Sequence, residues 1–172
     1  MGLDEQGEAM HKSKNNIIWV EPFLENHGAD ALRLWGAAES KLGSNYRFSR
    51  ERLEGSWRFL TKLWNIARFT SCFPTENESY LLTPLDRMFL NELNDSIREC
   101  SEGYEQTDFF IPAQAIRSFV WNVLADHYIE AVKTRAYNFD NAFNKEEQAA
   151  AWFTLHTCLR TALRLLAPVC PF

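Results

Sequence analysis

The chain has 172 residues and a formal net charge of −5 at pH 7, and 46% of its residues are hydrophobic. A chain of this length forms one ordinary domain with enough apolar side chains for a sizeable core. Glycine and proline are sparse, at 7 and 6 residues, which argues against a turn-rich β architecture and against disorder. No apolar run is long enough to span a membrane and the N-terminus is polar, so we expect a cytoplasmic protein without a membrane partner.

The cysteines and histidines do not form a metal-binding pattern. The cysteines lie far apart, none of them in a CxxC pair, and we interpret them as reduced, mostly buried thiols. They are Cys72, Cys100, Cys158 and Cys170. Asp126, His127 and Glu130 stand close together on an expected helix, but such a trio is typical of a solvated or locally paired face. We therefore expect no metal site.

Basic residues are concentrated in one segment of this acidic chain. Residues 44–73 carry six arginines and lysines against two acids, whereas residues 74–110 carry two against nine. Phosphate contacts need local lysine and arginine, so the overall charge argues against a general nucleic-acid binder, and we expect no DNA partner. The basic segment can still bind an anion.

Short elements are expected at the start of the chain. Residues 1–16 are polar and without periodicity, which predicts a loop. The run IIWV, residues 17–20, is β-branched and aromatic and favours a short strand. Two short helices are expected over residues 21–28 and 29–40, with Gly28 positioned to end the first of them.

Four long amphipathic helices are expected after these elements. Ser49, Thr83 and Asn144 are suitable N-caps for three of them. The expected ranges, caps included, are 49–73, 83–103, 112–135 and 144–167. In the first range, apolar residues recur at steps of three or four, and we interpret Trp57 and Trp64 as part of the core. The pattern predicts an all-α fold, a bundle of about four long antiparallel helices preceded by a shorter segment.

Lys62, Asn65 and Phe69 fall on one stripe of the first long helix, because they are spaced i, i+3 and i+7. The residues alone leave two explanations open. The stripe is either a packed seam between helices or a face that receives a flat and negatively charged ligand.

Five blocks in series resemble class I aminoacyl-tRNA synthetases, and the valyl-tRNA synthetases most closely. AMHKSKNN (9–16) is similar to the Lys-Met-Ser-Lys-Ser signature loop, and EPFLENHGADALRLW (21–35) to the helical block that follows it. Resemblance to the helical bundle is carried by RFSRERLEGSWRFLTKLWNIARF (47–69), LLTPLDRMFLNELN (81–94) and LRLLAPVCPF (163–172). Together the blocks cover essentially the whole chain in the expected order.

The resemblance implies a piece of a longer enzyme, with the signature loop and stem-connecting segment at 1–46 and the anticodon-binding bundle at 47–172. The parent enzyme would ligate valine to tRNA-Val using ATP with Mg. The His-x-Gly-His motif of the nucleotide-binding domain and the editing domain are missing from this sequence. We therefore expect the piece to bind tRNA and the rest of the synthetase chain, and to hold no catalytic residue, metal or cofactor of its own.

Lys12 and Ser13 match the second lysine and the following serine of the signature loop. The resemblance implies that they contact the ATP phosphates in the parent enzyme. The loop departs from the signature where Ala9, His11 and Asn15 replace its first lysine, first serine and glycine, and these changes would cost charge and loop freedom. The alternative, favoured for the isolated chain, is a polar tail without a role.

The resemblance also implies that Lys62, Asn65 and Phe69 face the anticodon bases, with Arg58 and Arg68 as phosphate contacts nearby. The side-chain chemistry agrees with this role. An unstacked base binds an aromatic plane, its edge binds an amide, and the RNA backbone binds a cation.

Other classes of protein remain as alternatives. The chain could be the same domain of an isoleucyl- or leucyl-tRNA synthetase, or a helical protein-interaction module without RNA binding, because fold does not fix function. The order of the five blocks argues against the interaction module. A free-standing enzyme is disfavoured, since no nucleophile–base or paired-carboxylate arrangement stands out.

Overall fold

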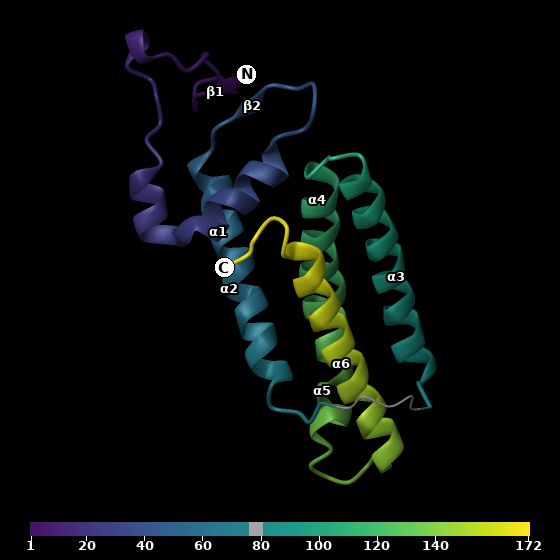
Figure 1. Cartoon of the computed structure of the whole chain (residues 1–172). Helices are drawn as coiled ribbons and strands as arrows, with labels where there is room; N and C mark the ends of the chain where they lie inside the picture. The colour runs from purple at the N-terminus through teal and green to yellow at the C-terminus, as the bar shows by residue number, and fades with distance from the viewer. Residues whose placement is uncertain (76–80) are drawn as a thin grey trace.

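The structure is a computed structural model that describes residues 1–75 and 81–172. Its main body is a bundle of long helices that lie side by side (Figure 1). The helices are α2 (Arg50–Thr70), α3 (Pro84–Glu105), a continuous rod made of α4 (Phe110–Ser118), the π-helical η2 (Phe119–Ile129) and α5 (Glu130–Tyr137), and α6 (Lys145–Leu166). The all-α prediction is thus confirmed. Within the described ranges, no helix is long and apolar enough to cross a membrane.

Side-chain caps explain where three of these helices begin. The hydroxyl of Ser49 accepts a hydrogen bond from a backbone N–H in the first turn of α2. Thr83 with Asp86, and Asn144 with Glu147, form reciprocal capping boxes at the starts of α3 and α6. All three caps are the residues expected from the sequence, because a cap depends only on its own first turn.

The buried face of α2 differs from the predicted one. It consists of Leu53, Ser56, Phe59, Leu63, Ile66 and Thr70. Trp57 and Trp64 are 44% and 68% exposed, so their assignment to the core is wrong. Two stripes with the same spacing fit this sequence, and adjacent residues such as Leu63 and Trp64 lie about 100° apart around a helix. The helix buries the stripe that contains Phe59, Leu63 and Ile66 and leaves the tryptophans on its surface.

A buried ion pair joins α3 to the rod that ends in α5. The guanidinium of Arg135 donates to both carboxylate oxygens of Asp86, one of them at 2.9 Å, and the hydroxyl of Tyr128 donates to the same carboxylate at 2.7 Å. Burial alone would raise the pKa of Asp86, but hydrogen bonds from Arg135, Thr83 and Tyr128 outweigh it and hold the pKa below its usual value. The charged carboxylate thereby ties Arg135 of α5 and Tyr128 of η2 to the start of α3.

The N-terminal segment packs at one end of the bundle (Figure 1). Its helix α1 (Glu21–Glu39) is kinked at Gly28, whose φ of 78° is a conformation that favours glycine. The strands β1 (Gly2–Leu3) and β2 (Tyr46–Arg47) pair in parallel, and η1 (Lys12–Lys14) is a short 3-10 turn. The first sixteen residues therefore hold two short elements where the sequence predicts only a loop.

Residues 17–20 form no strand, contrary to the prediction. The two-stranded sheet consists of β1 and β2 and does not include this run. Ile18 packs against a small apolar cluster of Phe23, Trp35, Phe48 and Leu53, whereas Trp19 is 66% exposed. Only one side of this run is packed, because Ile18 faces the apolar cluster and Trp19 faces solvent.

The four cysteines are free thiols, of which Cys100 and Cys158 are buried, Cys170 is partly buried and Cys72 is exposed. Burial raises the pKa of Cys100 to about 11 and that of Cys158 to about 12. Three of the four side chains are thus at least partly buried, in agreement with the expectation of mostly buried thiols. No group of three or more acidic, histidine or cysteine side chains that could hold a metal ion occurs among the residues the structure describes.

Candidate nucleic-acid interface

The stripe predicted to bind RNA lies on the edge of α2 that faces η2 and α5. Lys62 contacts side chains of η2, and Phe69 contacts a side chain of α5. Asn65 stands between them on the same edge by helical spacing and is exposed. Lys62 and Phe69 are half-buried, so the stripe packs as a seam along one flank and leaves a surface open to solvent along the other.

Lys62 is held by two residues of η2. Its ammonium nitrogen lies 2.7 Å from a carboxylate oxygen of Asp126 and 4.2 Å from the centre of the Trp121 ring. The Lys62 side chain keeps 27% of its surface exposed and that of Asp126 keeps 48%. The cation is therefore fixed in position and still reachable from solvent, and a phosphate or base that approaches it also meets the Asp126 carboxylate.

Phe69 offers only part of its ring to solvent. It packs edge to face against Phe73, with ring centres 5.1 Å apart, and against Tyr137 of α5, at 6.0 Å. It also contacts the main apolar core. A base can reach the outer part of this ring, but the aromatic surface at this end of α2 continues into Tyr137.

Arg58 and Arg68 are exposed, and in the described part of the chain neither takes part in an ion pair. Arg58 stands four residues before Lys62, and Arg68 lies in the last turn of α2. Their guanidinium groups can bind phosphate without breaking an existing pair, in contrast to Lys62.

Sequence reasoning missed three residues of this surface: Trp121, Asp126 and Tyr137. The sequence places Trp121 and Asp126 on the third expected helix, 112–135, and Tyr137 two residues beyond its expected end. It recognises Asp126 only as part of a solvated or locally paired trio. Glu130 is paired locally, with Lys133 three residues away, whereas Asp126 pairs with Lys62 of another helix, which the sequence does not predict. No local signal identifies Trp121 or Tyr137 as neighbours of the stripe.

The loop of residues 9–16, which resembles the signature loop, lies far from this stripe, at the other end of the molecule (Figure 1). Lys12 and Ser13 are exposed in η1. Asn15 adopts the left-handed conformation with a φ of 54°, which asparagine tolerates better than most residues. The loop is closed by Asn16, whose amide donates to Asp4 at 2.7 Å. The hydrogen bond from Asn16 lowers the pKa of Asp4.

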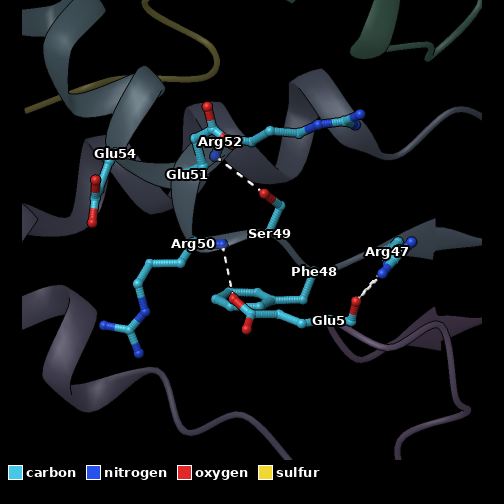
Figure 2. A pocket seen from close by; sticks show the side chains of 8 residues that line it. All are labelled: Glu5, Arg47, Phe48, Ser49, Arg50, Glu51, Arg52 and Glu54. Carbon is cyan, nitrogen blue, oxygen red and sulfur yellow. Dashed lines mark hydrogen bonds between the residues drawn. The ribbon is translucent and has the colours of Figure 1, made fainter.

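A pocket of about 610 Å³ lies where the N-terminal segment meets the start of α2. Figure 2 shows Arg47 donating to the backbone oxygen of Glu5, and the Glu5 carboxylate accepting from the backbone N–H of Arg50. The Arg50 guanidinium lies 5.2 Å from the ring centre of Phe23. Both arginines are therefore engaged in joining the two parts of the chain, and the mixed charge of the pocket does not favour an anion.

The same fold occurs in two solved aminoacyl-tRNA synthetases. The methionyl-tRNA synthetase of Mycobacterium tuberculosis, in complex with methionyl-adenylate, superposes on 99% of this chain and 35% of its own, with a TM-score of 0.76 and 20% identity. The LeuRS of Agrobacterium radiobacter K84, in a ternary complex with tRNA and LeuAMS, superposes on 99% of this chain and 20% of its own, with a TM-score of 0.73 and 18% identity.

The chain belongs to the family described as the anticodon-binding domain of tRNA ligase, which matches residues 86–172. It is 47% identical over its whole length to a valine–tRNA ligase of Pyrobaculum aerophilum and 42% identical to one of Aeropyrum pernix. A valine–tRNA ligase of Methanothermobacter thermautotrophicus is 41% identical over 99% of the chain. The family assignment made from the sequence is thus confirmed. The chain spans only 19% to 22% of the length of these relatives.

Proposed function

We propose that the chain is the tRNA-binding part of an enzyme that ligates valine to tRNA-Val with ATP, and that by itself it binds tRNA and does not catalyse. The observation that carries the proposal is the edge of α2. There an exposed amide, a partly exposed aromatic ring and three cations lie along one helix of a chain whose residues 86–172 match the anticodon-binding family. Because the full-length relatives named above are valine–tRNA ligases, the valyl assignment is favoured over the isoleucyl and leucyl alternatives.

Each residue of the stripe has a distinct part in this proposal. Asn65 is exposed and can donate to and accept from the edge of one base. Phe69 supplies the outer part of its ring for stacking. Arg58 and Arg68 bind backbone phosphates on either side of this base. Lys62 adds a third cation when its ion pair with Asp126 is replaced by a contact with the RNA.

Lys12 and Ser13 are proposed to serve the parent enzyme in its reaction with ATP. An ammonium group and a hydroxyl suit phosphate oxygens, and both side chains are exposed in η1. Asn15 adopts the left-handed backbone conformation, which glycine reaches readily. When bound, ATP and its Mg would provide the activated phosphate for the reaction. We further propose residues 1–46 as the signature and stem-connecting segment, residues 47–172 as the anticodon-binding part, and the cytoplasm as the place of action.

A titration of the chain with RNA, read by fluorescence anisotropy at two salt concentrations, tests the tRNA proposal. The probes are tRNA-Val, the same tRNA with an altered anticodon, and an unrelated tRNA. We expect preference for the native anticodon and a loss of that preference in Asn65→Ala. The matched control is Asn91→Ala, which removes an exposed asparagine of α3 instead.

Two results would contradict the proposal. Binding that falls steeply with salt but does not depend on the anticodon would mean that the basic edge only attracts phosphate. A folded chain that binds none of the three tRNAs would mean that the edge of α2 is not an RNA surface in this chain.

A further inference from the structure

The loop between α5 and α6 presents an aromatic surface that the proposed interface does not use. Phe139 is 82% exposed, although its ring could bury apolar area. Its ring lies parallel to that of Tyr137, with an interplanar angle of 12° and 5.0 Å between ring centres. Tyr137 in turn packs edge to face against Phe69. The aromatic surface therefore extends from the stripe of α2 across α5 to the outer face of Phe139.

The loop holds Phe139 in this exposed position. Asn138 ends α5 in the left-handed conformation, with a φ of 50°. Its side-chain amide donates to the backbone oxygen of Phe143 at 2.8 Å and accepts from the backbone N–H of the same residue at 3.0 Å. Because these bonds close the loop, a ligand that stacks on Phe139 meets a surface that is already ordered.

Charged and polar side chains surround the two rings. A pocket of about 200 Å³ beside them is lined by Lys133, Thr134, Tyr137, Asn138, Phe139, Asp140, Ala142 and Phe143. Lys133 is partly exposed and pairs with Glu130. This is one flat aromatic face with a cation, a carboxylate and an amide at its edge. An apolar protein segment would need a wider apolar groove, whereas a single base needs one ring face and polar partners.

We propose that the outer face of Phe139, supported from behind by Tyr137, stacks an unpaired base of the RNA loop that contacts the Lys62–Asn65–Phe69 stripe. The inference rests on the proposed function, because it takes its ligand from the continuity of this surface with Phe69. Phe69 shows only part of its ring, so Phe139 supplies the freely accessible aromatic face at this end of the bundle. Lys133 would bind the phosphate of the same nucleotide.

Substitution of Phe139 tests this stacking contact in the 172-residue chain. The probe is the anticodon stem-loop of tRNA-Val, followed by anisotropy. Phe139→Ala is expected to weaken binding about tenfold, as removal of a base–aromatic stack does, whereas Phe139→Tyr keeps a flat ring and should bind like the wild type. Phe172→Ala is the matched control, because Phe172 is also a freely exposed phenylalanine, 94% exposed at the end of the chain. The thermal unfolding midpoint of each variant should stay unchanged.

A second set of probes identifies the base. Hairpins that each lack one loop base are titrated against the wild type and Phe139→Ala. For one position, removal of the base should weaken binding to the wild type and have no further effect on the variant. The reason is that Phe139→Ala has already removed the contact that this base makes.

The outcomes separate this inference from the proposed function. If Phe139→Ala binds like the wild type while Asn65→Ala is weakened, the Phe139 contact is refuted and the proposed function stands. If Phe139→Ala weakens all hairpins equally, Phe139 does not stack a particular base and the inference is also refuted. If the wild type binds no hairpin or tRNA, both proposals fall together.

Discussion

Lys62 of α2 and Asp126 of η2 form an ion pair across the edge of the bundle, with 2.7 Å between the ammonium nitrogen and a carboxylate oxygen. The one cation of the Lys62–Asn65–Phe69 stripe is thus already bound to an acid of its own chain. Asp126 is 48% exposed, so its negative charge faces the same solvent from which RNA would approach. A phosphate must therefore displace the Asp126 carboxylate in order to bind Lys62.

Asp126→Asn is therefore expected to strengthen tRNA binding. A partly exposed ion pair contributes about 0–1 kcal/mol, so the release of Lys62 and the loss of a repelling charge should tighten binding by about two- to fivefold. Lys62→Met should weaken it. Dissociation constants measured by anisotropy at low and moderate salt test this, with Asp95→Asn of α3 as the control, since Asp95 pairs with Arg98 on an exposed surface. Weaker binding by Asp126→Asn would mean that Asp126 positions Lys62 rather than competes for it.

Arg135→Met is expected to destabilise the fold. The substitution leaves the fully buried carboxylate of Asp86 without its cation, and loss of one partner of a buried pair costs about 3–5 kcal/mol. Urea unfolding followed by circular dichroism measures the free energy of unfolding. Arg98→Met breaks the exposed Arg98–Asp95 pair and should cost less than about 1 kcal/mol. Equal losses in the two variants would show that the buried pair has no special weight.

The same pair predicts how stability depends on pH. The pKa of Asp86 lies below its ordinary value of 3.8 in the folded chain, so the unfolded chain binds the proton more readily. The stabilisation by this carboxylate is complete above the ordinary value and is lost as the pH falls through the lower folded value. The difference in unfolding free energy between the wild type and Asp86→Asn should be largest near neutral pH and shrink below about pH 3.8. A difference that grows on acidification would contradict the assigned direction.

The parts of the fold that depend on local sequence could be predicted. The caps at Ser49, Thr83 and Asn144 lie where the sequence indicates, because each involves only the first turn of its helix. The pairing of β2 with β1 could not be predicted, since it joins segments more than forty residues apart that are two residues long.

The sequence predicted which residues of α2 share one edge, but it did not predict which residues of other helices contact that edge. The spacing of Lys62, Asn65 and Phe69 places them on one edge of α2, and the structure agrees. Asp126 stands 64 residues after Lys62, and only the packing of η2 against α2 brings the two together. The same holds for Tyr137 beside Phe69.

The exposure of Trp64 gives a last prediction, which separates the two stripes of α2. Trp64 is 68% exposed, so Trp64→Ala should change the free energy of unfolding by no more than about 0.5 kcal/mol. Phe59 is fully buried in the main core, and Phe59→Ala should cost about 3–5 kcal/mol because it leaves a cavity. Urea unfolding of both variants provides the measurement. A large loss in Trp64→Ala with a small loss in Phe59→Ala would mean that α2 buries the tryptophan stripe, as the sequence pattern suggests, and that the edge carrying Lys62, Asn65 and Phe69 is turned away from η2.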